Sequence, residues 1–195
     1  MELNIVVVGV GGQGILTLSS IIAEACVREG VNVLVAETHG LSQRGGSVIV
    51  HVRIGDVEAP LVPLGEADLM LSMELIEAAR YANYLKPNAY IVANDYIVPP
   101  TPRTSYPDRE TITKTLSSRY KLDLVPATKK ALELGDPRTA NMILLGYTIE
   151  KKLIPLNLKT VEEVVKEKFE KNFQKNLEAL KLGIQLARRH RQFRL

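Results

Sequence analysis

The stretch of residues 3–14, Leu-Asn-Ile-Val-Val-Val-Gly-Val-Gly-Gly-Gln-Gly, decides the fold. Its β-branched run ends at Gly9, which is typical of a central parallel strand that is buried on both faces. Helical spacing follows, because apolar residues then recur every three or four positions, at Ile15, Leu18, Ile22 and Ala25. Gly30 ends this pattern. We therefore expect a strand, a glycine-rich turn and a helix over about residues 14–29, which together open a Rossmann-like domain.

Strand and helix patterns alternate along most of the remaining chain. Further strands are expected at residues 31–36, 47–54, 68–72, 89–94 and 121–125, and helices at 74–85, 111–119, 128–134 and 139–153. The strand at 31–36 completes a βαβ unit with a right-handed crossover, and Pro87 is expected to end the helix that precedes it. These patterns predict an α/β fold with a Rossmann-like, mostly parallel sheet flanked by helices.

The last third of the chain is expected to be helical. Apolar residues recur every three or four positions over a charged remainder, at Phe169, Phe173, Leu177, Leu180 and Ile184. Such a stripe favours core packing over ligand binding. Because no repeat, low-complexity tract or domain boundary interrupts the chain, we expect one domain over residues 1–195, with residues 157–195 as its helical C-terminal extension.

The composition is that of an ordinary globular domain. Of the 195 residues, 46% are hydrophobic and 24% are charged, which excludes a disordered or fibrous chain. The net charge is +3, and four arginines crowd the last eight positions, namely Arg188, Arg189, Arg191 and Arg194. We favour a solvated helix end over a nucleic-acid contact, because only 5% of the residues are aromatic and could stack on bases. No nucleic-acid partner is expected.

Cysteine usage and the lengths of apolar runs limit the class of protein further. Cys26 is the single cysteine, which excludes an intrachain disulfide and a clustered cysteine metal site, and its apolar helical context predicts burial. Apolar runs such as residues 5–8 are far shorter than the roughly 18 residues of a membrane span. No charged and then apolar leader precedes the first strand. We therefore expect a cytoplasmic protein without a membrane partner.

The motif at residues 9–14 is the first candidate site. Gly9, Gly11 and Gly14 satisfy the G-x-G-x-x-G pattern directly after a strand and at the start of a helix. The helix N-terminus presents unpaired N–H groups and a partial positive charge to a pyrophosphate or another anion. Glu37 stands where a ribose-binding acid is expected. The residues alone thus favour dinucleotide binding, with two alternatives: glycines that serve only strand-to-helix packing, or a turn that faces another anionic ligand or a partner subunit.

A polar segment at residues 37–46 is the second candidate site. The carboxyl end of the second strand borders the ligand crevice of an open parallel sheet. The side chains expected near the glycine turn are therefore those of His39, Ser42, Gln43 and Arg44. Arg44 is the preferred ligand for a phosphate or carboxylate, because its guanidinium group binds two oxygens at once. His39 has no second histidine nearby and is interpreted as a hydrogen-bonding loop residue, and Ser42 lacks the context of a nucleophile. The alternative is an ordinary surface loop.

Together these segments resemble the gamma-type subunit of ferredoxin-dependent 2-oxoacid oxidoreductases, and most closely the small (beta) subunit of indolepyruvate ferredoxin oxidoreductase. The resemblance covers most of the chain. It begins at residues 9–14 and continues through 37–46, the strand with Ser47, Val48 and Arg53, the positions Glu74, Glu77 and Ala78, and residues 141–146. The stretch Gln-Arg-Gly-Gly at residues 43–46 is its most specific part.

The resemblance implies a single gamma-type domain in an enzyme that decarboxylates a 2-oxoacid on thiamine diphosphate, sends electrons through iron–sulfur clusters to ferredoxin and transfers the acyl group to coenzyme A. This chain has no Gly-Asp-Gly metal–diphosphate motif, and one cysteine cannot ligate a cluster. Thiamine diphosphate, Mg²⁺ and 4Fe-4S clusters are therefore expected on a larger partner subunit. This chain is expected to bind no cofactor by itself and to be inactive alone.

The resemblance also implies cofactor-binding positions that face coenzyme A or the partner subunit: Gly9, Gly11, Gly12, Gln13, Gly14, Gln43, Arg44, Gly45 and Gly46. No catalytic residue and no metal ligand are assigned. The phosphates of coenzyme A suit a helix N-terminus flanked by an arginine. The competing hypothesis is a free-standing NAD- or flavin-binding oxidoreductase, which only the glycine pattern and Glu37 favour.

Overall fold

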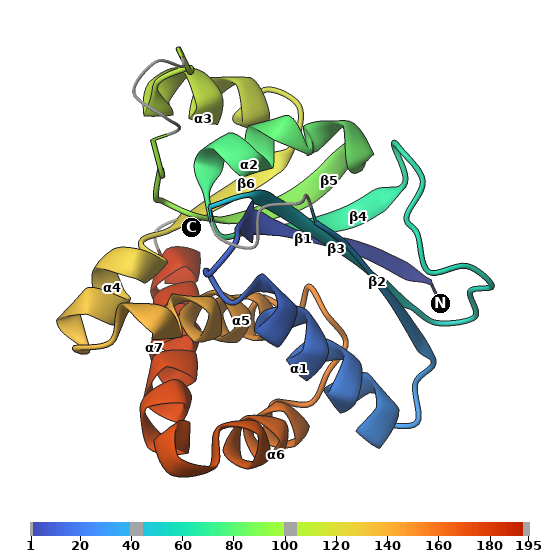
Figure 1. Ribbon diagram of the computed structural model, residues 1–195, viewed down its shortest axis with the longest axis vertical. Coiled ribbons are helices and arrows are strands. Elements are labelled where there is room, and N and C mark those ends of the chain that lie inside the picture. The colour runs from blue at the N-terminus through green and yellow to red at the C-terminus, as the bar shows by residue number, and fades with distance from the viewer. Residues whose placement is uncertain (1, 40–44, 100–104, 193–195) are drawn as a thin grey trace.

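The computed structural model describes residues 2–39, 45–99 and 105–192, and these form a six-stranded sheet with helices on both faces (Figure 1). The strands are β1 (Leu3–Val10), β2 (Val33–His39), β3 (Ser47–Ile54), β4 (Ala67–Ser72), β5 (Leu85–Asn94) and β6 (Lys121–Val125). Their order across the sheet is β2-β3-β1-β4-β5-β6. The predicted α/β class is confirmed.

One strand, β3, runs against the others. It pairs antiparallel with both β1 and β2, whereas β1, β4, β5 and β6 pair parallel in succession. β2 therefore runs in the same direction as β1, but β3 is inserted between them. As a result, the amino end of β3 lies at the same edge of the sheet as the carboxyl end of β1, and Ser47 pairs with Val10.

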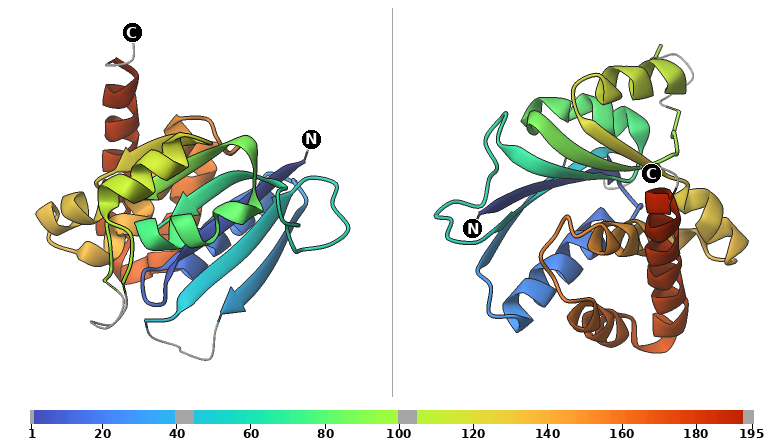
Figure 2. Two further views of the ribbon diagram at one scale, coloured as in Figure 1. Left: turned by 90° about the horizontal axis from the view of Figure 1, so that it is seen from above. Right: turned by 180° about the vertical axis from the view of Figure 1, so that it is seen from behind.

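Helices cover both faces of the sheet because successive side chains of its strands point to opposite faces. One face carries α1 (Ile15–Arg28), α4 (Ala127–Glu133), α5 (Ala140–Glu150), α6 (Leu158–Phe169) and α7 (Phe173–Gln192), and the other carries α2 (Leu75–Arg80) and α3 (Arg109–Ser117) (Figure 1, Figure 2). In β1, Ile5 and Val7 belong to the core under α1 and α5. Val6 and Val8 belong to the core under α2 and α3.

Helix α5 is buried from Ala140 to Ile149 and packs against α7. The two helices cross at glycines. A Cβ on Gly146 would lie 2.0 Å from the carbonyl oxygen of Leu180, and a Cβ on Gly183 would lie 2.0 Å from the carbonyl oxygen of Ile143. The two backbones are therefore in contact, and a side chain at either glycine would force them apart.

The core predictions for the helices are confirmed. The apolar stripe of the last third packs into or against the core through Phe169, Phe173, Leu177, Leu180 and Ile184. Cys26 is buried as well, and burial raises the pKa of its thiol to about 11. Among the helices of the described ranges, none is both long and apolar enough to cross a membrane.

The helix predicted over residues 74–85 is shorter in the structure. Helix α2 ends at Arg80, and a short 3₁₀ turn separates it from β5. Pro87 lies inside that strand, so its predicted role in ending a helix is wrong. The strand tolerates Pro87 because the pairing of β5 with β4 is shifted before Tyr90 and Asn88 has a positive φ of 62°. The missing N–H of the proline therefore interrupts no regular ladder.

Gly146→Ala is expected to lower the free energy of unfolding by about 2–3 kcal/mol. The added methyl group would overpack the core, because it would clash with the backbone carbonyl of Leu180, which cannot move aside as a side chain could. In an open helix the same substitution would stabilise by about 1 kcal/mol. Chemical denaturation measures the difference. Gln185→Ala, on the exposed side of α7, is the control and should change stability by less than about 0.5 kcal/mol. An unchanged stability of Gly146→Ala would contradict the close crossing.

Candidate functional site

The glycine turn, residues 9–14, lies at the edge of the sheet where the carboxyl ends of β1 and β4 meet the amino end of β3. β1 leads into α1 on one face of the sheet, and β4 leads into α2 on the other face (Figure 1). In open α/β sheets, ligands bind where neighbouring strands send their connections to opposite faces. The turn therefore borders the favoured ligand position of this fold.

The last residues of the polar segment, Gly45 and Gly46, lie next to the turn. The N–H of Gly11 donates a hydrogen bond of 2.8 Å to the carbonyl oxygen of Gly46. Gly45, with a φ of 75°, is exposed beside it. The predicted site residues that lie outside the described part of the chain are Ser42, Gln43, Arg44 and the side chain of His39.

Most N–H groups at the start of the turn are bonded within the protein. The N–H of Val10 donates to Oε1 of Gln13 at 2.8 Å, and the N–H of Gln13 donates to the carbonyl oxygen of Val10 at 3.1 Å. The described residues offer no acceptor to the N–H groups of Gly12 and Gly14, and none of their side chains caps α1. In the described ranges, these two N–H groups at the positive end of α1 are thus left without a partner, as is typical of an anion-binding helix N-terminus.

The glycines of the turn are needed for two different reasons. Gly9 and Gly14 allow close packing: a Cβ would lie 2.7 Å from Oε1 of Gln13 at the first and 2.4 Å from Nδ2 of Asn141 at the second. Gly14 and Gly12 have φ values of 75° and 101°, which other residues rarely adopt. Among the described residues, no atom lies within 4 Å of the Cβ position of Gly12, apart from the glycine itself and its two chain neighbours.

Glu37 does not stand beside the turn. It lies on β2, where it pairs with Val50 of β3, and β3 separates it from β1. Because neighbouring strands are about 4.8 Å apart, β2 lies about 10 Å from β1. In dinucleotide-binding domains the second strand is the direct neighbour of the first. The arrangement therefore does not support the interpretation of Glu37 as a ribose-binding acid.

Two buried glutamates, Glu74 and Glu77, lie at the start of α2. Glu74 accepts hydrogen bonds from the N–H groups of Glu77 at 2.7 Å and Val98 at 3.1 Å, and burial raises its pKa. Glu77 accepts a hydrogen bond from the hydroxyl of Ser47, which lies 2.9 Å from the hydroxyl of Tyr81. In the described ranges, no group of three or more His, Cys, Asp or Glu residues could hold a metal ion. These carboxylates are accordingly hydrogen-bond acceptors of the scaffold.

Sequence reasoning alone did not assign the roles of these glutamates. An acceptor side chain followed three residues later by an acid is the signal of a capped helix start. This spacing could have identified Glu74 as the cap of α2. The partner of Glu77 could not be found in this way, because Ser47 lies on a strand far away in the sequence.

Residues 4–186 of the chain match the family model described as pyruvate ferredoxin/flavodoxin oxidoreductase. The chain belongs to this family. It is 45% identical to the protein of Archaeoglobus fulgidus named indolepyruvate oxidoreductase subunit IorB, over 94% of each chain. It is 39% identical to the protein of the same name from Pyrococcus horikoshii, over 96% of each chain. The predicted resemblance is thereby confirmed.

A solved structure of the same kind places this fold inside a longer polypeptide. The 2-oxoglutarate:ferredoxin oxidoreductase from Magnetococcus marinus, solved with 2-oxoglutarate, coenzyme A and succinyl-CoA bound, is 28% identical and aligns with a TM-score of 0.76. The alignment covers 96% of this chain and 31% of that chain. Nearly all of this chain therefore corresponds to about a third of that oxidoreductase polypeptide.

Two further residues that the resemblance singled out, Asn141 and Arg53, form hydrogen bonds that stabilise the fold. Asn141, near the start of α5, donates a hydrogen bond of 3.1 Å from Nδ2 to the carbonyl oxygen of Gly14. This bond joins the end of the glycine turn to α5. Arg53 donates to Oδ1 of Asn4 and to the carbonyl oxygen of Ala59, both at 2.8 Å. Because Arg53 lies at the carboxyl end of antiparallel β3, it is at the opposite edge of the sheet from the turn.

Gly14→Ala is expected to destabilise the protein more than Gly12→Ala. Both substitutions place a Cβ at a positive φ, which costs about 1–2 kcal/mol. At Gly14 the Cβ also meets the side chain of Asn141, so we expect a further loss of about 1–3 kcal/mol from overpacking. Denaturation midpoints of the two variants measure the difference. Equal losses would contradict the contact between Gly14 and Asn141.

Proposed function

We propose that this chain is the small subunit of an indolepyruvate:ferredoxin oxidoreductase and that its glycine turn binds a phosphate group of coenzyme A in the complex with a larger subunit. The names of the Archaeoglobus and Pyrococcus relatives support the first part. One observation carries the second: at the N-terminus of α1, close to Gly46, the N–H groups of Gly12 and Gly14 have no acceptor among the described residues. The polarity of this surface suits an anion.

In this proposal the chemistry of the reaction belongs to the complex and not to this chain. The 2-oxoacid loses carbon dioxide, its acyl group passes to the thiol of coenzyme A, and ferredoxin takes the electrons. Thiamine diphosphate, Mg²⁺ and 4Fe-4S clusters are placed on the larger subunit. The single cysteine supports this placement, because Cys26 is buried and its thiol has a raised pKa, whereas a cluster needs several accessible thiolates.

The residues of this chain would hold coenzyme A by hydrogen bonds to its phosphate oxygens. The N–H groups of Gly12 and Gly14 would donate to one phosphate group. Arg44, one residue before Gly45, would add a bidentate, charge-assisted pair, and Gln43 and Gly46 would border the same anion. The role of this chain is thus to orient the acyl acceptor, and its turn needs no proton-transfer group for that task.

Arg44→Ala, introduced into the assembled complex, is expected to raise the KM for coenzyme A about 10- to 100-fold, because a hydrogen bond to a charged group is worth about 1.5–3 kcal/mol. The KM for the 2-oxoacid should change less than twofold. Steady-state kinetics measure both constants. Arg119→Ala is the matched control, because Arg119 is an exposed arginine that precedes β6 at the opposite edge of the sheet.

Hydrogen exchange of the same complex tests the proposal directly. Saturating coenzyme A should slow exchange in the peptide that contains residues 9–14, and NADH at the same concentration should leave it unchanged. An Arg44→Ala variant with an unaltered KM for coenzyme A, together with unaltered exchange of the turn, would contradict the proposal. Slowing by NADH would favour the free-standing dinucleotide-binding enzyme instead.

A further inference from the structure

Hydrogen bonds connect the glycine turn to α2 through Gly46 and Ser47, where β3 begins. Gly46 accepts the hydrogen bond from Gly11, and the next residue, Ser47, donates from its hydroxyl to a carboxylate oxygen of Glu77. Tyr81, one helical turn after Glu77, places its own hydroxyl 2.9 Å from the same serine oxygen. Two consecutive residues, Gly46 just before β3 and Ser47 at its start, therefore connect the turn on one side to α2 on the other.

The carboxylate of Glu77 is buried and held in place. The residue is 5% exposed, and its second carboxylate oxygen accepts a hydrogen bond of 3.0 Å from Nε of Arg80. Glu74 fixes the helix beneath it, because Glu74 bonds both the N–H of Glu77 and the N–H of Val98. Glu77 is thus a rigid, charged acceptor, and charge-assisted hydrogen bonds are stronger than neutral ones.

The other contacts of Glu77 do not explain why a carboxylate is buried at this position. The cap of α2 is supplied by the side chain of Glu74. The ion pair with Arg80 is formed by a side chain that is 56% exposed, and such pairs add little to stability. Within the described ranges, the contact of Glu77 that remains is the one to Ser47, the residue that follows Gly46.

We propose that Glu77 is a positioning residue for the glycine turn: through Ser47 it keeps the carbonyl oxygen of Gly46 on the N–H of Gly11. This bond fixes the backbone between β1 and α1, so that the N–H groups of Gly12 and Gly14 face the crevice. Without it, the turn would sample other conformations and would have to be ordered by its ligand, which weakens binding. The identity of that ligand as coenzyme A rests on the proposed function, whereas the order of the turn does not.

The test compares Ser47→Ala, Glu77→Ala and Glu77→Gln in the complex with the larger subunit. Without coenzyme A, hydrogen exchange of the peptide that contains Gly11 should be about tenfold faster in the two alanine variants. With coenzyme A, their KM for it should rise about tenfold, while the KM for the 2-oxoacid stays within twofold of wild type. Glu77→Gln should lie between wild type and the two alanine variants in both measurements, because its amide oxygen still accepts from Ser47 but forms a weaker, neutral hydrogen bond.

Glu163→Gln is the matched control, since it removes one exposed carboxylate on α6, on the other face of the sheet (Figure 1). It should behave like wild type in both measurements. Unchanged exchange at the turn in Ser47→Ala would overturn the inference, even if Glu77→Ala fails to fold. Equal rises in both KM values would also overturn it. Faster exchange with an unchanged KM for coenzyme A would support the positioning role and contradict the proposed function.

Discussion

The hydrogen bond from the N–H of Gly11 to the carbonyl oxygen of Gly46 is the constraint on which the site depends. It joins two glycine-rich segments that lie far apart in the sequence. The bond exists because β3 runs antiparallel to β1, which brings the first residue of β3, Ser47, opposite the last residue of β1, Val10. A third strand parallel to β1 would begin at the opposite edge of the sheet and would leave the turn without this partner.

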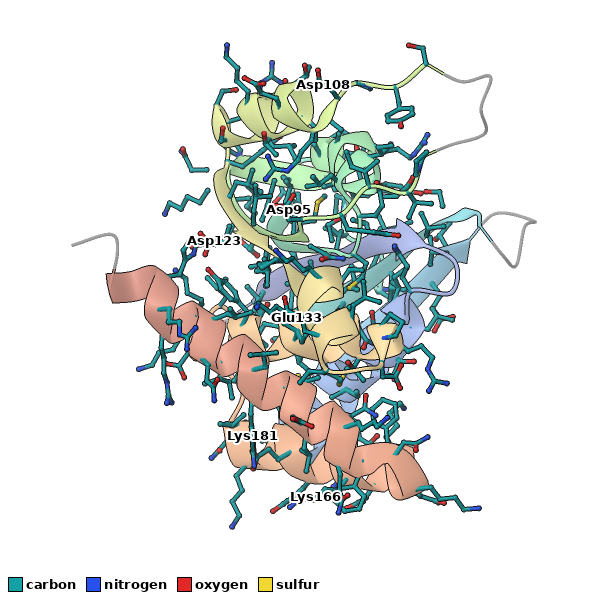
Figure 3. The ribbon with its side chains drawn as sticks, turned by 90° about the vertical axis from the view of Figure 1, so that its left-hand side faces the viewer. Asp95, Asp108, Asp123, Glu133, Lys166 and Lys181 are labelled. Carbon is teal, nitrogen blue, oxygen red and sulfur yellow. The ribbon has the colours of Figure 1, made fainter. Side chains whose placement is uncertain are left out.

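Residues from both faces of the sheet bond the turn or the strand beside it. Asn141 of α5 donates to the carbonyl oxygen of Gly14 from one face, and Glu77 of α2, on the other face, accepts from Ser47 of β3. A second polar cluster belongs to the scaffold alone: Asp123 of β6, labelled in Figure 3, accepts from Tyr90 at 2.7 Å and Tyr147 at 2.9 Å. Burial alone would raise the pKa of Asp123, but these hydrogen bonds and the charge of nearby Lys151 hold it below its usual value. Because β6 is the third strand from β1, this cluster lies away from the turn, and through Tyr147 it joins α5 to the sheet.

Features whose signal lies within one segment of the sequence could be predicted, whereas features that depend on contacts between distant segments could not. The run at residues 3–8, the glycines after it and the periodic helix to Arg28 were predictable because each signal is contained in its own segment. Neither the direction of β3 nor its place between β1 and β2 was predictable, because the apolar pattern of a strand specifies neither its direction nor its neighbours. Glu37 was misplaced because its distance from the turn depends on this strand order. The hydrogen bond between Ser47 and Glu77 joins two elements far apart in the sequence, so no local sequence pattern predicts it. The role of Arg44 stays a prediction.

The measurement that tests the account most directly is a structure of the complete complex, with the larger subunit and coenzyme A bound. The account predicts a phosphate oxygen of coenzyme A within hydrogen-bond distance of the N–H of Gly12 or Gly14, and a Gly11 N–H that still donates to Gly46. Coenzyme A held wholly by the larger subunit, with the turn covered by protein, would contradict it. So would a nicotinamide or flavin cofactor seated on the turn.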